Sequence, residues 1–205
     1  MAPMTTLLQL VLDEPGEGVS VEAALGLADL IDALEIGPRL LQVHGPPLVR
    51  AVRDAMPDRA VVCWAETADE ATALLEAGIA GLTIPASLPD GTLKAIIAVG
   101  RRAGRRVLLD LKGGAEPERV MALKPDCVKV PVEVNVREVL GGLRPLDLPV
   151  AFSGDWSVAQ VPWLLVYRPV ALVAGPVVAT APEPRRILEA VRARMAITPT
   201  MSRFY

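Results

Sequence analysis

The sequence predicts a single α/β domain with the architecture of a (β/α)8 TIM barrel. Its length of 205 residues suits one domain. Short apolar segments alternate eight times with segments whose apolar residues recur at helical spacing. Apolar residues make up 52% of the chain, as expected when parallel strands are buried on both faces. Eight βα units favour closure into a barrel over an open doubly wound sheet.

Each expected strand is short, rich in Val, Leu and Ile, and bounded by turn residues. The strands are expected at residues 7–14, 33–37, 60–66, 81–86, 106–113, 126–132, 149–155 and 171–177. The helices are expected at residues 21–34, 47–56, 67–78, 90–104, 117–123, 136–143, 158–166 and 183–195. Residues 1–195 therefore form the expected barrel, and residues 196–205 fall outside the repeat as a C-terminal tail.

Composition and motifs exclude several classes of function. The net charge is −3 and its charges are scattered, so neither nucleic acid nor a lipid surface is an expected partner. Arg168 and Pro169 interrupt the most apolar stretch, so no membrane span is expected. No basic signal-peptide region opens the chain, and we expect a cytoplasmic protein. Cys63 and Cys127 have no metal-type spacing and fall in expected buried strands.

The carboxyl ends of the strands are where a (β/α)8 barrel carries its functional side chains. The polar and glycine residues at these ends are Asp13, Glu35, Trp64, Glu66, Asp110, Lys112, Lys129, Glu133, Ser153, Gly154, Asp155 and Gly175. Charges in an apolar interior must be paired. The carboxylates and lysines among them therefore form either a catalytic site or a structural salt-bridge network, and both interpretations stay open.

Individual residues at the mouth also have two interpretations. Lys129 is a candidate nucleophile or base with a lowered pKa, or a partner of Asp110 or Glu133. Trp64 either stacks on a ligand or fills the mouth. His44, the only histidine, is expected in a turn after the second strand and is more often incidental than catalytic there.

The glycine turns after the seventh and eighth strands are typical places for phosphate binding. Backbone N–H groups hold phosphate at such turns in barrels of this kind. Ser153, Gly154 and Gly175 are therefore candidate substrate-binding residues, although glycine also occurs there for tight turns alone.

The segments LQLVLDE, LEIGPRL, PDRAVV to LLEAGIAGLTI, VLLDLKG with PERV, and PVAFSGD resemble the orotidine-monophosphate-decarboxylase-like superfamily. They are most similar to its branch of 3-hexulose-6-phosphate synthase and 3-keto-L-gulonate-6-phosphate decarboxylase. The resemblance spans nearly the whole chain. It implies that Asp13 binds substrate, that Glu35 lies near Mg²⁺ and that Asp110 is the strand-5 aspartate. It also implies a homodimer in which Asp69 reaches the partner's site.

The chain departs from the family at the third strand, where the signature Asp-x-Lys-x-x-Asp reads Trp64 to Asp69. Trp64 stands at the metal-ligand aspartate, and Glu66 stands at the catalytic lysine. Lys129 replaces the family's histidine on the sixth strand. The Gly-Arg phosphate clamp after the eighth strand has become Gly175-Pro176.

A second similarity is to the class I aldolases that cleave 2-keto-3-deoxy-6-phosphogluconate. In that comparison Lys129 is the Schiff-base lysine, with Glu35 and Arg39 on the second strand.

Three functions follow from the two resemblances and the departures. The first is a carbon–carbon lyase or isomerase that acts on a small carbonyl or sugar-phosphate substrate through an enolate or enediolate. Lys112 or Lys129 would supply positive charge in it, and Asp13, Asp110 and Glu66 are its candidate acids and bases. The second is a Schiff-base aldolase that uses Lys129. The third is a non-catalytic or repurposed barrel.

Overall fold

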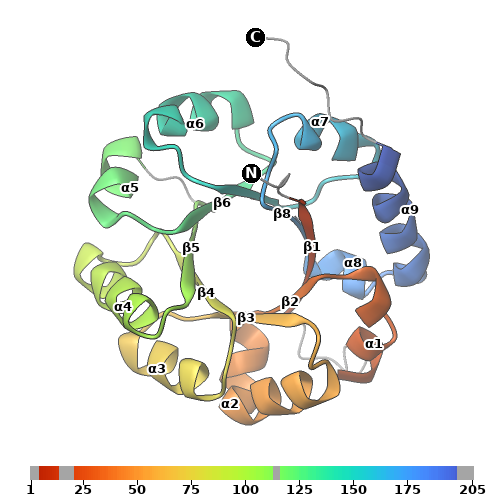
Figure 1. Cartoon of the computed structure of the whole chain (residues 1–205), viewed down its shortest axis with the longest axis horizontal. Helices are drawn as coiled ribbons and strands as arrows, with labels where there is room; N and C mark the ends of the chain where they lie inside the picture. Colours follow the sequence, from red (N-terminus) through yellow and green to blue (C-terminus); the bar gives the residue numbers. More distant parts are fainter. Residues whose placement is uncertain (1–4, 14–20, 113–115, 198–205) are drawn as a thin grey trace.

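The computed structural model describes residues 5–13, 21–112 and 116–197. Eight parallel strands close into one barrel in chain order, and helices surround it, which confirms the predicted fold class (Figure 1). The strands are β1 Leu7–Leu12, β2 Ala33–Ile36, β3 Ala60–Trp64, β4 Gly81–Pro85, β5 Arg106–Asp110, β6 Cys127–Pro131, β7 Val150–Ser153 and β8 Ala171–Ala174. None of the helices within these described ranges is long and apolar enough to cross a membrane.

The helices follow the strands as the alternation predicts. They are α1 Val21–Leu25, α2 Pro38–Ala55, α3 Ala68–Glu76, α4 Asp90–Arg102, α5 Pro117–Leu123, α6 Val136–Leu143, α7 Val161–Leu165, α8 Pro176–Ala179 and α9 Pro184–Ile197, with 3-10 turns at Ala28–Leu30, Arg144–Leu146 and Val158–Gln160. Thr67 caps α3 in a capping box with Glu70, so the expected start of that helix is confirmed.

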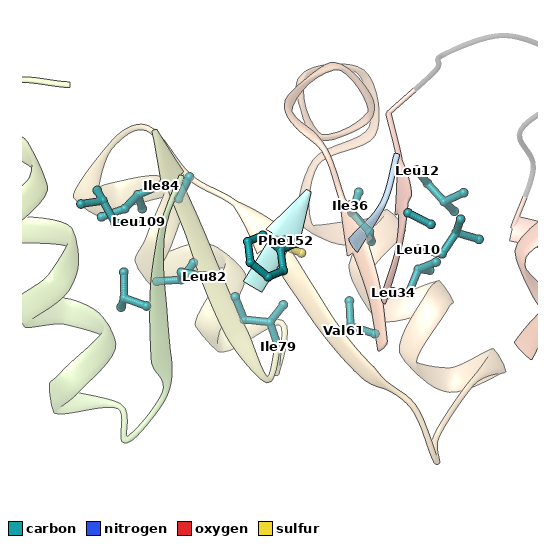
Figure 2. Close-up of a cluster of buried hydrophobic side chains, with 14 of the residues drawn as sticks. Leu10, Leu12, Leu34, Ile36, Val61, Ile79, Leu82, Ile84, Leu109 and Phe152 are labelled. Carbon is teal, nitrogen blue, oxygen red and sulfur yellow. The ribbon is translucent and has the colours of Figure 1, made fainter. Parts of the chain in front are cut away.

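The outward faces of the strands form the main core. Leu10, Leu34, Leu82 and Leu109 are fully buried between the barrel and the helices, and Figure 2 shows these side chains on strands β1, β2, β4 and β5. Because successive side chains of a strand point to opposite faces, the residues between them point into the barrel. A separate small apolar cluster inside the barrel consists of Leu108, Cys127, Ala151, Ala171 and Val173.

The strand register arranges the inward side chains in layers. Because the strands of such a barrel are tilted, a layer perpendicular to the barrel axis does not follow the hydrogen-bonded partners. From each strand to the next it moves one residue further toward the carboxyl end, so only every second strand contributes an inward side chain to a given layer. One layer holds Gln9, Val62, Leu108 and Ala151. The next layer toward the carboxyl ends holds Glu35, Thr83, Lys129 and Val173, and the one above it holds Val11, Trp64, Asp110 and Ser153.

Two expected helices differ from the structure near the second strand. The region expected as one helix at 21–34 contains α1 and the 3-10 turn Ala28–Leu30. It ends before Ala33, because Ala33 and Leu34 pair with β1 as part of β2. The helix expected at 47–56 is the second helical segment of α2, because Gly45, whose φ is 57°, is not helical; the first segment, which begins at Pro38, was not expected. His44 is exposed and directly precedes the non-helical Gly45, so the expected turn is present as the break between the two helical segments of α2.

The end of the chain also differs from the pattern. The strand expected at 171–177 stops at Ala174, because Gly175 caps the short helix α8 and Pro176 occupies its first position. The last helix, α9, continues to Ile197, so the first two residues of the expected tail are helical. Residues 198–205 lie outside the described residues.

Candidate active site

A buried cluster of charges lies inside the upper part of the barrel. Lys129 Nζ donates to Glu35 Oε1 at 2.9 Å and to Glu35 Oε2 at 3.0 Å, and it lies 3.3 Å from Asp110 Oδ2. Gln9 Nε2 donates to Glu35 Oε2 at 2.5 Å. All four residues are at most 5% exposed. The register explains the contacts, since Glu35 and Lys129 share one layer and Asp110 lies in the layer above.

Two carboxylates hold Lys129 in its charged form. Burial, the largest single influence, lowers the pKa of Lys129, but Glu35 and Asp110 raise it, and the net pKa lies above the ordinary value. The lowered pKa that the sequence suggested is therefore not found. Pairing with Asp110 is confirmed, whereas Glu133 bonds elsewhere and Glu35 takes its place. A Schiff base requires a neutral amine, so these contacts disfavour that chemistry.

Trp64 lies over the ammonium, one layer closer to the mouth. The distance from Lys129 Nζ to the Trp64 ring centroid is 5.9 Å, within the range of a cation–π interaction. Trp64 Nε1 donates to Glu66 Oε1 at 3.0 Å. Glu66 is thereby placed at the mouth as the hydrogen-bond partner of Trp64, on the exposed side of the indole ring.

Asp110 is held from two sides. Its Oδ1 accepts a hydrogen bond from the Lys112 backbone N–H at 2.9 Å, while its Oδ2 faces Lys129. The Lys112 side chain is exposed and forms no ion pair with the described residues. It is a positive charge at the rim rather than a member of the buried cluster.

Asp13 lies where β1 meets the first turn of α2. Its Oδ1 accepts from Arg39 N at 2.8 Å, at a helix end whose N–H groups have no partner within the helix. A Cβ on Gly37 would overlap the Asp13 carboxyl group, so glycine permits this close approach. Asp13 thus stabilises the start of α2, at the same rim where the sequence predicted it.

The β7–β8 side of the rim brings together Ser153, Gly154 and Gly175, as the sequence predicted. Glu133 Oε1 accepts from Asp155 N at 2.5 Å, directly against this turn. Gly154 has a φ of 93°, and a Cβ there would overlap the Glu133 carboxylate. Ser153 is 8% exposed, and Gly175 is the N-cap of α8.

Asp69, the remaining expected binding residue, is exposed in the first turn of α3. Sequence reasoning missed two interior residues, Gln9 and Thr83. Thr83 Oγ1 is fully buried and has no hydrogen-bond partner among the described residues. A polar residue at an inward position of an otherwise apolar strand was the available signal for both.

The residues around Glu35 do not fit Mg²⁺. Both Glu35 oxygens accept hydrogen bonds from Lys129, and Oε2 also accepts from Gln9. A lysine ammonium at this distance would repel a divalent cation, which takes six oxygen ligands. Within residues 5–13, 21–112 and 116–197, no group of three or more His, Cys, Asp or Glu side chains is placed to hold a metal. No step of the proposed chemistry uses one.

No family model matches the chain. The chain is 24% identical over 205 residues to 3-hexulose-6-phosphate synthase of Mycobacterium gastri, covering 92% of this chain and 99% of that protein. It is 24% identical over 199 residues to a 3-keto-L-gulonate-6-phosphate decarboxylase of Escherichia coli, covering 88% and 90%. The crystal structure of 3-keto-L-gulonate-6-phosphate decarboxylase from Vibrio cholerae has a TM-score of 0.78 at 18% identity, covering 94% and 98%. The two sequence relatives confirm the resemblance inferred above, and the solved structure shows the same fold.

Proposed function

We propose that this chain, whose relatives include a 3-hexulose-6-phosphate synthase and a 3-keto-L-gulonate-6-phosphate decarboxylase, is a carbon–carbon lyase. Its substrate is a small carbonyl compound, and the bond next to the carbonyl breaks through an enolate or enediolate. The observation that carries the proposal is the charged Lys129 between Glu35 and Asp110, at the carboxyl end of the barrel.

The contacts of Lys129 suggest how a substrate would engage it. The contact to Asp110 is the longest of the three, at 3.3 Å, so it is the one that a carbonyl oxygen can replace most readily. When the carbon–carbon bond breaks, its electron pair passes into the carbonyl group and the oxygen becomes negative. The ammonium then faces this oxygen in surroundings from which water is largely excluded, where a fixed charge is most effective.

Asp110 is the proton-transfer group in this scheme. The carboxylate stays oriented by the Lys112 N–H at 2.9 Å after its other oxygen leaves Lys129. It can then remove a proton from the substrate, and the resulting acid can return a proton to the enolate carbon. Trp64 must turn away from Lys129 for the substrate to enter. The hydrogen bond from the Trp64 indole N–H to Glu66 holds the ring in place until then.

Enolate formation can be measured directly. Small ketones and aldehydes are incubated with the protein in deuterated water, and exchange of the hydrogen next to the carbonyl is followed by NMR. Asp110→Asn and Lys129→Met should each lower the exchange rate about 100-fold or more, the loss seen when one oxyanion donor is removed. Lys94→Met, an exposed lysine on α4, is the matched control and should leave the rate unchanged.

A repurposed, non-catalytic barrel is the second candidate, and one observation favours it. The ammonium of Lys129 already has three oxygen contacts and the Trp64 ring above it, so the cluster is complete without a ligand. Absence of exchange and of bond cleavage across the carbonyl panel would favour this candidate. Borohydride treatment with a keto acid tests the aldolase alternative, and we expect no adduct on Lys129.

We also propose that the chain forms a homodimer. Asp69 is exposed at the first turn of α3, where the family resemblance places a residue that reaches the partner's site. Sedimentation at micromolar concentration tests this, and a monomer would contradict it.

A further inference from the structure

The rim between β7 and β8 contains a feature that bears on the class of substrate. In barrels of this kind, backbone N–H groups of the loops after these strands bind the phosphate of a substrate. In this chain the N–H of Asp155 already donates to the Glu133 carboxylate at 2.5 Å. The left-handed backbone of Gly154 lets this carboxylate lie directly on the turn, at a place where any Cβ would overlap it.

The neighbouring turn after β8 is equally unsuited to an anion. The first residue of α8 is Pro176, which has no N–H, and the N–H of Val178 donates to the Gly175 carbonyl. Asp155 Oδ1 lies 3.8 Å from the position that a Gly175 Cβ would occupy, so a second carboxylate faces this turn.

No cation lies against the two carboxylates at the rim among the described residues. Neither Glu133 nor Asp155 forms an ion pair with another described residue, whereas a phosphate site requires positive charge or free N–H donors. A phosphate dianion would have to displace Glu133 from Asp155 N and approach two like charges.

We infer that Glu133 takes the place of a substrate phosphate at the β7–β8 rim, and that the site accepts an unphosphorylated carbonyl substrate that is neutral or cationic at the end facing this rim. The identity of this molecule as a substrate rests on the proposed function. The exclusion of phosphate itself rests only on the geometry of the two turns. Glu133 is therefore a specificity-determining residue, and Asp155 reinforces its effect.

Amide NMR of the full ¹⁵N-labelled chain tests the inference without an activity assay. The probes are inorganic phosphate and dihydroxyacetone phosphate, with dihydroxyacetone and sodium chloride of matched ionic strength as controls. In the wild-type protein, neither phosphate probe should shift the amide signals of Gly154, Asp155 or Val177. In Glu133→Ala, which frees the Asp155 N–H, both should shift them, with affinity raised about tenfold or more, the size of one charge-assisted hydrogen bond.

Three outcomes would overturn the inference. They are saturable shifts of these amides by phosphate in the wild type, silence in both the wild type and Glu133→Ala, and turnover of a phosphorylated carbonyl in preference to its unphosphorylated counterpart. Preferred turnover of the phosphorylated compound would refute the exclusion of phosphate and leave the proposed lyase function intact. A wild-type protein that binds no phosphate and turns over no carbonyl compound would refute only the proposed lyase function. Glu133→Ser also removes the carboxylate from the Asp155 N–H, and it replaces Glu133→Ala if that variant does not fold. Glu76→Ala, an exposed carboxylate at the end of α3, is the control and should behave as the wild type.

Discussion

Replacing Lys129 by methionine should destabilise the barrel by about 4 kcal/mol. The side chains of Lys129 and Glu35 are only 6% and 1% exposed, and the ammonium also faces Asp110. Methionine keeps most of the volume but leaves two carboxylates buried without a cation. Removal of one partner from a buried ion pair costs about 3–5 kcal/mol of stability. Because two carboxylates lose their partner here, we expect a loss above the lower end of that range. The substitution Glu35→Gln/Lys129→Met should cost less, about 1–2 kcal/mol, because only Asp110 is then left without a cation, and it keeps its hydrogen bond from the Lys112 N–H.

Urea unfolding measures both variants, and tryptophan fluorescence is a suitable signal because Trp64 lies over the cluster. A double-mutant cycle over Lys129 and Glu35 should give a coupling of about 2–3 kcal/mol. The exposed pair Arg186–Glu183 is the control, with side chains 79% and 66% exposed and an N–O distance of 3.0 Å. Its coupling should stay below about 0.5 kcal/mol. A cost below about 1 kcal/mol for Lys129→Met would refute the claim that these contacts keep Lys129 charged in a dry interior.

Three further predictions concern buried side chains. Thr83→Val should raise the free energy of unfolding by about 1 kcal/mol, because it removes a buried hydroxyl without a partner among the described residues; a loss of stability would show that this hydroxyl is bonded. The folded-state pKa of Lys129 lies above its ordinary value of 10.5, so its stabilisation is complete below pH 10.5 and is lost as the pH rises through the folded value; the urea midpoint should therefore fall at alkaline pH, and fall less in Lys129→Met. Burial raises the pKa of both thiols, that of Cys127 to about 12, so a thiol-specific reagent at about pH 8 should label neither Cys63 nor Cys127 until the chain is unfolded in urea, and rapid labelling of the native protein would contradict their burial.

Much of the barrel follows from local pattern. α5 and α6 begin at the expected residues 117 and 136, and α3 begins directly after Thr67, at the start of the expected range 67–78. The errors lie where a local signal had two outcomes. Pro47 predicted the start of a helix, and a helical segment does follow Gly45, whose φ of 57° breaks α2; the pattern missed the helical segment that precedes it from Pro38. Gly175 and Pro176 looked like the end of a strand and instead begin α8.

The candidate site shows the same division. The strand-end rule places Glu35, Asp110 and Lys129 at one mouth from the sequence alone. It does not say that Lys129 joins Glu35 across the barrel, because Glu35 and Lys129 are on strands that do not pair with each other. The rule misses Gln9, which lies one layer below Glu35 and Lys129, and it misses Thr83, which shares their layer but stands in the middle of β4.

The sequence by itself determined the eight βα units, the closed parallel barrel and the set of charged residues at its carboxyl end. These depend on periodicity and on the order of elements along the chain, which are local properties. Only the tertiary structure decided which charges pair, that Lys129 stays an ammonium, and that Glu133 lies on the turn after β7. Pairing and pKa depend on distance and desolvation between side chains far apart in the sequence, and closure of the barrel sets both.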